Sequence, residues 1–253
     1  MATFRPDPLA YLTGRLEPGD RPRSISDASG GGKFLATGEV LQFPGNTIIC
    51  HIDKTSRAFE ALVALQECLK RGPYAACFTY LPHESFHMTV FQGISGTRIK
   101  AEDWPKRIEL GSSRDEVTAH IIKELDALSM PTSFRIASRD LFAGHSLTVE
   151  GADDAEEDAL RSVRNTLRDR LGIRRQDFDT YTFHVTLAYL LTWVDQIQAR
   201  EIVGYSSECY RAFEADLAEI RIGPMELCVF ENMHRFECVA TLGRNGIDAV
   251  VTA

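Results

Sequence analysis

Phe86-His87-Met88-Thr89-Val90 is a short run of sequence that recurs in the second half of the chain as Phe183-His184-Val185-Thr186-Leu187. Each copy has an aromatic residue, a His, an apolar residue, a Thr and an aliphatic residue, within a stretch that favours a β-strand. Successive side chains of a strand point to opposite faces, so the His and the Thr share one face while their neighbours point into a core. Each copy therefore predicts an imidazole beside a hydroxyl.

The two copies together predict a catalytic site. They would supply one proton acceptor, one proton donor and two hydroxyl donors, which suits in-line displacement at a phosphate without a metal. A single His-x-Thr is more often an ordinary strand histidine, but two copies with matched flanks favour function. Among the remaining histidines, His83 has a hydroxyl residue, Ser85, two positions on, but it follows Pro82 and lacks the apolar flanks.

A zinc hydrolase is an alternative, because His83-Glu84-Ser85-Phe86-His87 satisfies the H-E-x-x-H pattern. That mechanism needs both histidines one helical turn apart, with the Glu as general base. Pro82 and the β-rich sequence on either side of the motif make a helix there unfavourable. We therefore predict no metal ligands and no cofactor.

Composition limits the class of protein. With 253 residues and 44% hydrophobic content, the chain can form one large domain or two small lobes. The formal net charge of −8 argues against nonspecific binding of long nucleic acid. We find no membrane-spanning run and no secretory signal, and so expect a monomer in the cytoplasm that binds no membrane. The six cysteines form no C-x-x-C pair, which favours reduced, buried thiols.

Two basic or glycine-rich segments have simple structural interpretations. Gly30-Gly31-Gly32-Lys33 resembles the end of a P-loop, but Asp27 replaces its first Gly and Phe34 replaces the final Ser or Thr. A flexible turn is expected instead. The arginines between Arg161 and Arg175 have helical spacing beside acidic residues, which is more typical of a solvated helix face than of a phosphate groove.

The hydrophobic pattern predicts an α+β fold. Helices are expected over residues 56–71, 113–128, 154–171 and 194–213. Strands are expected over residues 34–43, 46–52, 76–81, 85–94, 134–142, 146–150, 181–191, 217–222, 226–231 and 236–242. Strand, helix and His-bearing strand thus occur twice. This order predicts two similar lobes, each a mainly antiparallel sheet with helices on its outer face, flanking a central cleft.

The domain boundaries follow from the same pattern. Residues 1–33 are rich in Pro, Gly, Asp, Arg and Ser and are expected to form an irregular N-terminal arm. Residues 34–253 would form the bilobal domain, with the first His motif at 87–89 and the second at 184–186.

The paired tripeptides resemble the two-histidine (2H) phosphoesterase superfamily of RNA ligase and cyclic phosphodiesterase type, whose signature is two H-x-[ST] motifs on strands of two related lobes. Phe91-Gln92-Gly93 is similar to the aromatic residue and Gly that follow the family's first motif. The order of elements agrees over roughly residues 46–242. The arm resembles that of an uncharacterised bacterial branch.

The resemblance implies a hydrolase, a cyclic phosphodiesterase, that acts without metal on 2′,3′-cyclic phosphates or 2′-5′ linkages in small nucleotides and in RNA ends, as in RNA processing. His87 and His184 would be the acid and base, and Thr89 and Thr186 would bind phosphate oxygens. The sequence does not show which His is the acid.

Strand alternation adds further candidates for the cleft. Ser85, Phe91 and Thr182 share the parity of their His and should line it, whereas Gln92 and Tyr189 should point away. Phe91 could stack on a base or serve packing alone. A non-catalytic nucleotide-binding protein on the same fold remains an alternative function. Two titratable groups favour the enzyme, since a binding protein needs donors only.

Overall fold

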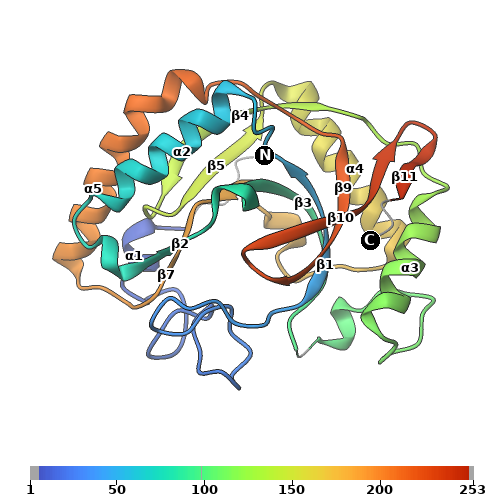
Figure 1. Ribbon diagram of the computed structural model, residues 1–253, viewed down its shortest axis with the longest axis horizontal. Helices are drawn as coiled ribbons and strands as arrows, with labels where there is room; N and C mark the ends of the chain where they lie inside the picture. Colours follow the sequence, from blue (N-terminus) through green and yellow to red (C-terminus); the bar gives the residue numbers. More distant parts are fainter. Residues whose placement is uncertain (1–5, 98, 251–253) are drawn as a thin grey trace.

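A curled sheet organises the fold, and the computed structural model describes residues 6–97 and 99–250 of the chain (Figure 1). In chain order the strands are β1 (Gly45–His51), β2 (Phe78–Tyr80), β3 (His87–Ser95), β4 (Phe134–Phe142), β5 (Ser146–Gly151), β6 (His184–Thr186), β7 (Ala188–Leu190), β8 (Ile220–Ile222), β9 (Met225–Asn232), β10 (Arg235–Gly243) and β11 (Gly246–Val250). Nine of them form one sheet in the order β11-β10-β9-β1-β3-β6-β5-β4-β8, and β2 pairs with β7. Every pairing of these strands is antiparallel.

The helices begin at the side chains that the sequence offers as caps. They are α1 (Pro8–Leu12), α2 (Arg57–Lys70), α3 (Arg114–Leu125), α4 (Asp154–Leu171) and α5 (Gln196–Phe213). Ser56, Ser113, Asp153 and Asp195 each accept a hydrogen bond from a backbone N–H of the first turn of the helix that follows. These bonds satisfy donors that would otherwise lack a partner, and the four predicted helices are confirmed.

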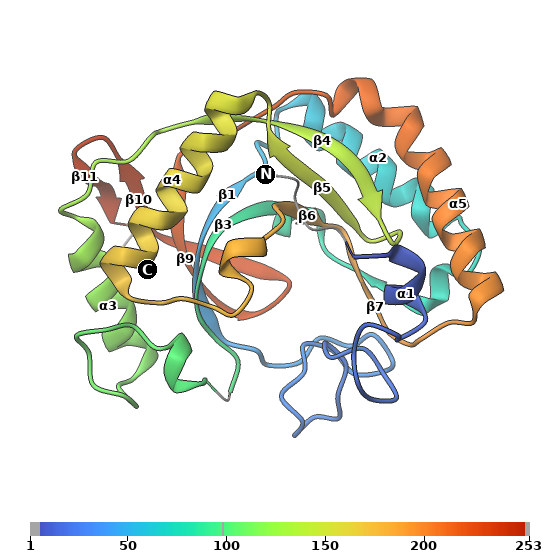
Figure 2. The same cartoon turned by 180° about the vertical axis from the view of Figure 1, so that it is seen from behind.

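The longer helices cover one face of the sheet, and part of the arm lies on the other face. Helices α2 and α5 pack side by side at one end, and α3 lies against α4 at the other (Figures 1 and 2). Their apolar faces bury Leu62, Ile121, Leu160 and other side chains against strand residues such as Met88 and Val185 in one large core. Because Met88 and Val185 point into this core, the residues next to them point to the opposite, concave face.

The two halves of the sheet meet where β3 pairs with β6, through Met88 and Val185. Strands β9 to β11, from the end of the chain, extend the β1–β3 side, and β4, β5 and β8 extend the β6 side. The α+β class, with a mainly antiparallel sheet and outer helices, is confirmed. The sheets of the two halves join edge to edge at this pair.

The arm and the segment after it differ from the prediction. Helix α1 lies in the arm and packs on α5. The strand predicted over 34–43 is wrong, because the chain folds back on itself there. Gly38 has a φ of +88°, its N–H donates to the Leu35 carbonyl at 2.9 Å, and Phe34 makes only isolated bridges, to Ile25 and to Val40. Strand β11 was not predicted.

The cysteine prediction is wrong for one pair. Cys68 on α2 and Cys209 on α5 form a disulfide, with Cα atoms 6.1 Å apart. The helix packing brings together two thiols that are 141 residues apart in sequence. Cys50, Cys77, Cys228 and Cys238 are free, and Cys50 and Cys228 are buried.

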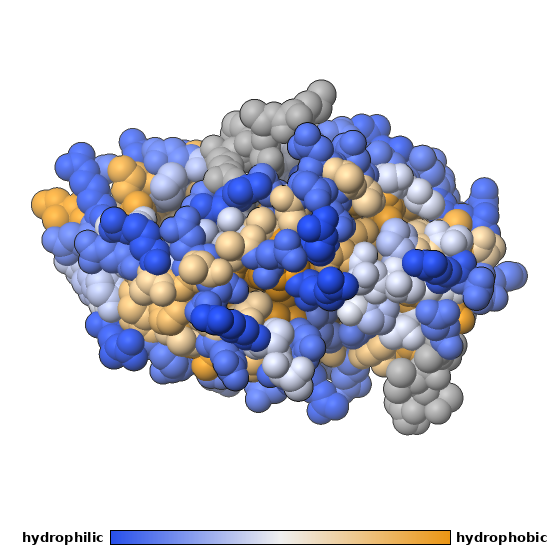
Figure 3. Space-filling model, turned by 90° about the horizontal axis from the view of Figure 1, so that it is seen from above, coloured by the Kyte–Doolittle hydropathy of each residue, from blue (hydrophilic) through white to orange (hydrophobic). Residues whose placement is uncertain are grey.

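One face of the molecule is mostly polar. Figure 3 shows a largely hydrophilic face with hydrophobic residues gathered near its middle. Among the described residues, the exposed large hydrophobic side chains are those of Leu16, Leu110 and Ile197. No helix in the described ranges is long and apolar enough to cross a membrane.

Candidate active site

The structure brings the four residues of the two motifs together on the concave face. The register of the β3–β6 pair places His87 beside Thr186 and Thr89 beside His184, so the two imidazoles lie on a diagonal. A cavity of about 420 Å³, called here the central cavity, is lined by all four. The His-x-Thr parity of both motifs thus holds in the fold.

Both imidazoles are held in the same way. The Nδ1 atom of His87 lies 2.6 Å from the carbonyl oxygen of Ser85, and Nδ1 of His184 lies 2.8 Å from the carbonyl oxygen of Thr182. A carbonyl can only accept, so each Nδ1 carries a proton and donates it. In the neutral ring Nε2 is then the nitrogen that can accept a proton from a molecule in the cavity.

The surroundings keep both rings neutral at pH 7. Burial lowers the pKa of His87 to about 3, opposed by the Ser85 carbonyl and reinforced by His51, His184 and Lys33. Burial also lowers the pKa of His184, opposed by the Thr182 carbonyl, while Lys33 lowers it and Asp177 raises it. Asp177 is thus among the main influences on His184, where its effect is smaller than the opposing effect of Lys33.

Lys33 is a functional candidate that the sequence analysis missed. Its Nζ donates to the Tyr189 hydroxyl at 3.1 Å and lies over the rings of Phe43 and Tyr189, 5.4 and 4.9 Å from their centroids. It lines the central cavity with the two histidines. A cation at this point can neutralise a bound phosphate.

The glycine run before Lys33 fixes its position. The N–H of Gly32 donates to the Ser26 hydroxyl at 2.8 Å, and the N–H of Lys33 donates to the Ser24 carbonyl at 2.7 Å. A Cβ at position 32 would come within 2.7 Å of the Ser26 Oγ and 2.9 Å of the Ser24 carbonyl oxygen. Glycine is needed for this close approach, so the Gly-Lys sequence was a signal for a placed cation.

Phe91 does not line the cleft, contrary to the prediction. In the β1–β3 pair Ile48 faces Phe91 and Ile49 faces Thr89, so a bulge leaves one extra residue on β3. The bulge reverses the alternation beyond Thr89. Phe91 is 3% exposed and belongs to the core, and Gln92 lines the central cavity in its place.

A similar irregularity follows the second motif. The N–H groups of Leu187 and Ala188 both donate to the His145 carbonyl, at 2.8 and 3.2 Å. Both side chains are buried, so the parity changes between them. Tyr189 therefore lines the central cavity, although the sequence predicted that it points away.

Ser85 and Thr182 act through their backbone carbonyls. Residues 83–85 form a turn of 3₁₀ helix in place of a strand, so Ser85 is buried and its hydroxyl donates to the Pro82 carbonyl at 2.7 Å. The prediction that Ser85 lines the cleft is wrong. Thr182 lines a second cavity beside His184. Each carbonyl orients the catalytic candidate two residues later.

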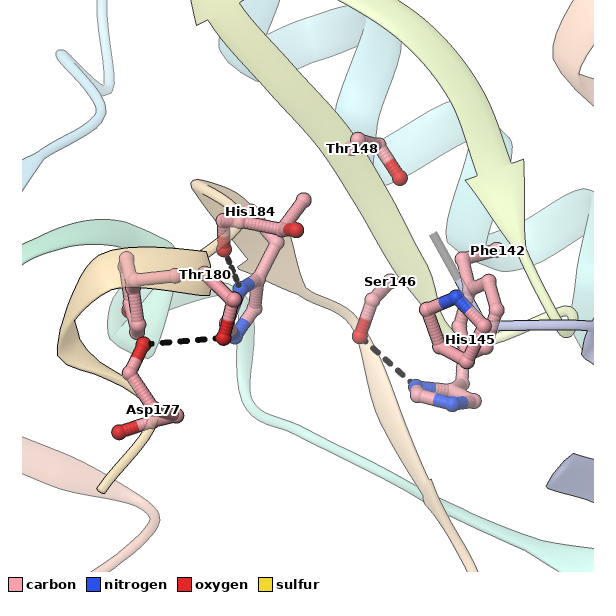
Figure 4. A pocket seen from close by; sticks show the side chains of 10 residues that line it. Phe142, His145, Ser146, Thr148, Asp177, Thr180 and His184 are labelled. Carbon is pink, nitrogen blue, oxygen red and sulfur yellow. Dashed lines mark hydrogen bonds between the residues drawn. The ribbon is translucent and has the colours of Figure 1, made fainter. Parts of the chain in front are cut away.

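The second cavity has a volume of about 320 Å³ and lies on the β5 side of His184 (Figure 4). Thr148 and Ser146 on β5 face His184 and Thr186 on β6 and line it. The Oγ of Ser146 lies 2.7 Å from Nδ1 of His145, which is 9% exposed, and burial lowers the pKa of His145 to about 3. This cavity offers neutral hydroxyl groups next to one of the two catalytic candidates.

A third, larger groove shares lining residues with both cavities and is called here the basic groove. It has a volume of about 870 Å³, and the charged residues that line it are Arg23, Lys100, Arg174 and Arg175 together with Asp103 and Asp177. Arg23 and Arg175 also line the central cavity. The arginines between residues 161 and 175 therefore have different surroundings. Arg164 is buried and donates to backbone carbonyls. Arg174 and Arg175, which follow α4, line the groove.

The zinc-hydrolase alternative lacks its structural basis. His83 lies in a 3₁₀ turn and His87 begins β3, so they are not one α-helical turn apart. The Nε2 of His83 lies 2.9 Å from the Gln66 side-chain oxygen, and His87 bonds to the Ser85 carbonyl. The two rings do not form the zinc pair of the H-E-x-x-H motif.

Residues 33–145 match the family model described as 2H-phosphodiest, a domain of unknown function (DUF1868). The resemblance to two-histidine phosphoesterases is confirmed. The matched range includes the first His motif and Lys33, and it supports phosphoesterase activity without naming a substrate.

Two solved structures are similar to this chain. A conserved protein of unknown function from Agrobacterium tumefaciens is 27% identical, with a TM-score of 0.83 over 92% of this chain and 97% of that one. The apo form of Escherichia coli LigT is 11% identical, with a TM-score of 0.42 over 80% of this chain and 99% of that one. No curated protein matches the chain.

Proposed function

We propose that this 2H phosphoesterase hydrolyses 2′,3′-cyclic phosphates or 2′-5′ linkages of nucleotides and RNA ends without a metal. The observation that carries the proposal is the convergence of His87, His184, Thr89 and Thr186 on one cavity that also receives Lys33. Two imidazoles and two hydroxyls match the needs of in-line displacement, and a cation offsets the charge of the phosphate.

Proton transfer would run through the two Nε2 atoms. In hydrolysis of a cyclic phosphate, the neutral imidazole takes a proton from water as the water oxygen attacks phosphorus. The bond from phosphorus to the 2′ or 3′ oxygen breaks, and the second ring, which enters the step as an imidazolium with a proton on Nε2, gives that oxygen the proton. Thr89 and Thr186 would donate hydrogen bonds to the non-bridging oxygens.

We assign the acid to His184 and the base to His87. Asp177 favours the protonated form of His184 and partly offsets Lys33, whereas the side chains with the largest effects on His87 (His51, His184 and Lys33) disfavour its protonated form. A bound phosphate anion would raise the pKa of both rings, and we expect His184, on which Asp177 acts, to gain its proton first.

The basic groove favours an RNA end over a mononucleotide. Arg23 and Arg175 line both the groove and the central cavity, so a phosphate one nucleotide away from the reacting group could bind there. The net charge of −8 is consistent with short strands as substrates.

The test incubates the full chain with 2′,3′-cyclic mononucleotides, with a dinucleotide that ends in a 2′,3′-cyclic phosphate, and with 2′-5′ linked dinucleotides, with and without EDTA. We expect chelator-resistant hydrolysis, faster for the dinucleotide, and its loss in His87→Ala. Binding without turnover would favour the nucleotide-binding alternative. Activity that is lost in EDTA and restored by zinc would refute the metal-free mechanism.

A further inference from the structure

A second group of chemically reactive side chains lies on the concave face, outside the central cavity. His51 at the end of β1 and Glu226 and Cys228 on β9 offer a ring nitrogen, a carboxylate oxygen and a thiol within 4.8 Å of one another. Among the described residues this is the group of His, Cys and acidic side chains whose spacing suits a metal ion. The cavity formed by the two His motifs does not include any of the three.

The distances between these atoms are close to those of a metal site. Nδ1 of His51 lies 2.7 Å from Oε2 of Glu226, and Sγ of Cys228 lies 3.8 Å from the same oxygen. Tetrahedral zinc, with bonds of about 2.0 Å to nitrogen and oxygen and about 2.3 Å to sulfur, holds its ligand atoms roughly 3.3 to 3.8 Å apart. The Glu226–Cys228 spacing already fits this range, the His51–Glu226 pair must open by roughly half an ångström, and the His51 and Cys228 atoms lie within 4.8 Å of each other.

The sheet register supplies a fourth donor. Cys238 on β10 pairs with Cys228 on β9, so the two thiols lie side by side on the same face. Two thiols, an imidazole and a carboxylate are the donor types that zinc and related transition metals prefer.

The low exposure of the cluster favours binding of a cation. Cys228 is fully buried, and the side chains of His51 and Glu226 are only 25% and 20% exposed. Within the described residues Glu226 forms an ion pair with His51 alone. A carboxylate and thiols close together in a site of low exposure are stabilised when a divalent cation replaces their protons.

We infer that His51, Glu226 and Cys228, with Cys238 as fourth donor, form a binding site for a divalent transition-metal ion of the zinc type. The ion would tie β1, β9 and β10 together. The ring of His51 lies 6.2 Å from the ring of His87, centroid to centroid, so the site would brace the strand next to the base. The site is independent of the proposed reaction, in which no metal takes part.

The test titrates the full chain, purified under reducing conditions and freed of metal, with Zn²⁺ and with Co²⁺. We expect one ion per chain, a rise in melting temperature on adding Zn²⁺, and a thiolate-to-cobalt absorption band. Glu226→Gln, Cys228→Ser and His51→Gln should each weaken Zn²⁺ binding by at least about 10- to 100-fold, the effect of losing even an outer partner of a site. His51→Gln changes a partly exposed side chain, so it tests the site even if Cys228→Ser does not fold.

The matched control is Cys77→Ser, which removes a free, half-buried thiol elsewhere and should bind Zn²⁺ like the parent. Binding that survives His51→Gln and Glu226→Gln, or that is lost in the control, would overturn the assignment. A Cys228–Cys238 disulfide in a folded protein that takes up no metal after reduction would also overturn it. Metal-dependent hydrolysis alone, without a change at this cluster, would refute the proposed function and leave the site intact.

Discussion

Replacing Lys33 by Met tests whether the arm supplies part of the active site. Lys33 lines the central cavity, and its ammonium lies near the rings of Phe43 and Tyr189. Met keeps the length and the apolar stem of the side chain but deletes the charge. The arm should keep its fold, because the glycine turn and the backbone bonds of residue 33 do not involve the ammonium.

The expected fall in kcat/KM corresponds to the loss of one charge-assisted hydrogen bond to a phosphate oxygen. Such a bond contributes about 1.5 to 3 kcal/mol, so kcat/KM should fall about 10- to 150-fold. Loss of the Lys33 charge should also shift the pH profile of kcat/KM, in one predictable direction. The positive charge of Lys33 lowers the pKa of both His87 and His184, so its removal should move the acid limb of the kcat/KM profile to higher pH.

The measurement is kcat/KM against pH for a 2′,3′-cyclic dinucleotide, with the parent, Lys33→Met and Lys33→Arg. The Arg variant keeps the charge and should leave the acid limb where the parent has it. Unfolding curves of all three exclude a loss of fold. A Met variant as fast as the parent, or a slow one whose acid limb has not moved, would show that Lys33 has only a packing role.

Three further predictions follow from the same geometry. His87→Ala and His184→Ala should each lower kcat about 10²- to 10⁴-fold with the fold intact, and full activity by either would exclude that ring as an acid or base. Thr89→Val and Thr186→Val keep the β-branched shape but lose a donor, so each should slow the reaction about 10- to 1,000-fold without moving the limbs of a bell-shaped pH profile. Burial lowers the pKa of His145 from 6.5 to about 3. As the pH falls below 6.5, His145 therefore takes up a proton in the unfolded chain but stays neutral in the folded protein. In urea unfolding the parent should therefore lose about 2 kcal/mol more stability between pH 7 and pH 5 than His145→Gln, and equal losses would contradict the burial argument.

Much of the fold could be predicted because its signals are local. The four longer helices start at Ser56, Ser113, Asp153 and Asp195, whose side chains satisfy free N–H groups of the first turn. The His-x-Thr parity also depends only on strand geometry over three residues. That is why the four motif residues could be proposed from sequence, and why the structure finds them on one face.

The rest of the site depends on contacts between distant segments. The β3 bulge beside β1 turns Phe91 into the core and Gln92 into the cavity, and the shared His145 carbonyl turns Tyr189 inward. Simple alternation cannot predict either change, because the partner strand decides where an extra residue is accommodated. The disulfide between Cys68 and Cys209 likewise exists only because two helices pack together.

The sequence by itself determined the four candidate reacting and binding groups: two imidazoles and two hydroxyls in matched strands. The tertiary structure decided where these groups meet and what surrounds them. It joined β3 to β6, folded the arm so that Lys33 reaches the cavity, and placed the basic groove beside it. The physical reason is that side-chain type and local conformation are properties of short segments, whereas a cavity and its electrostatic field arise from residues far apart in the chain.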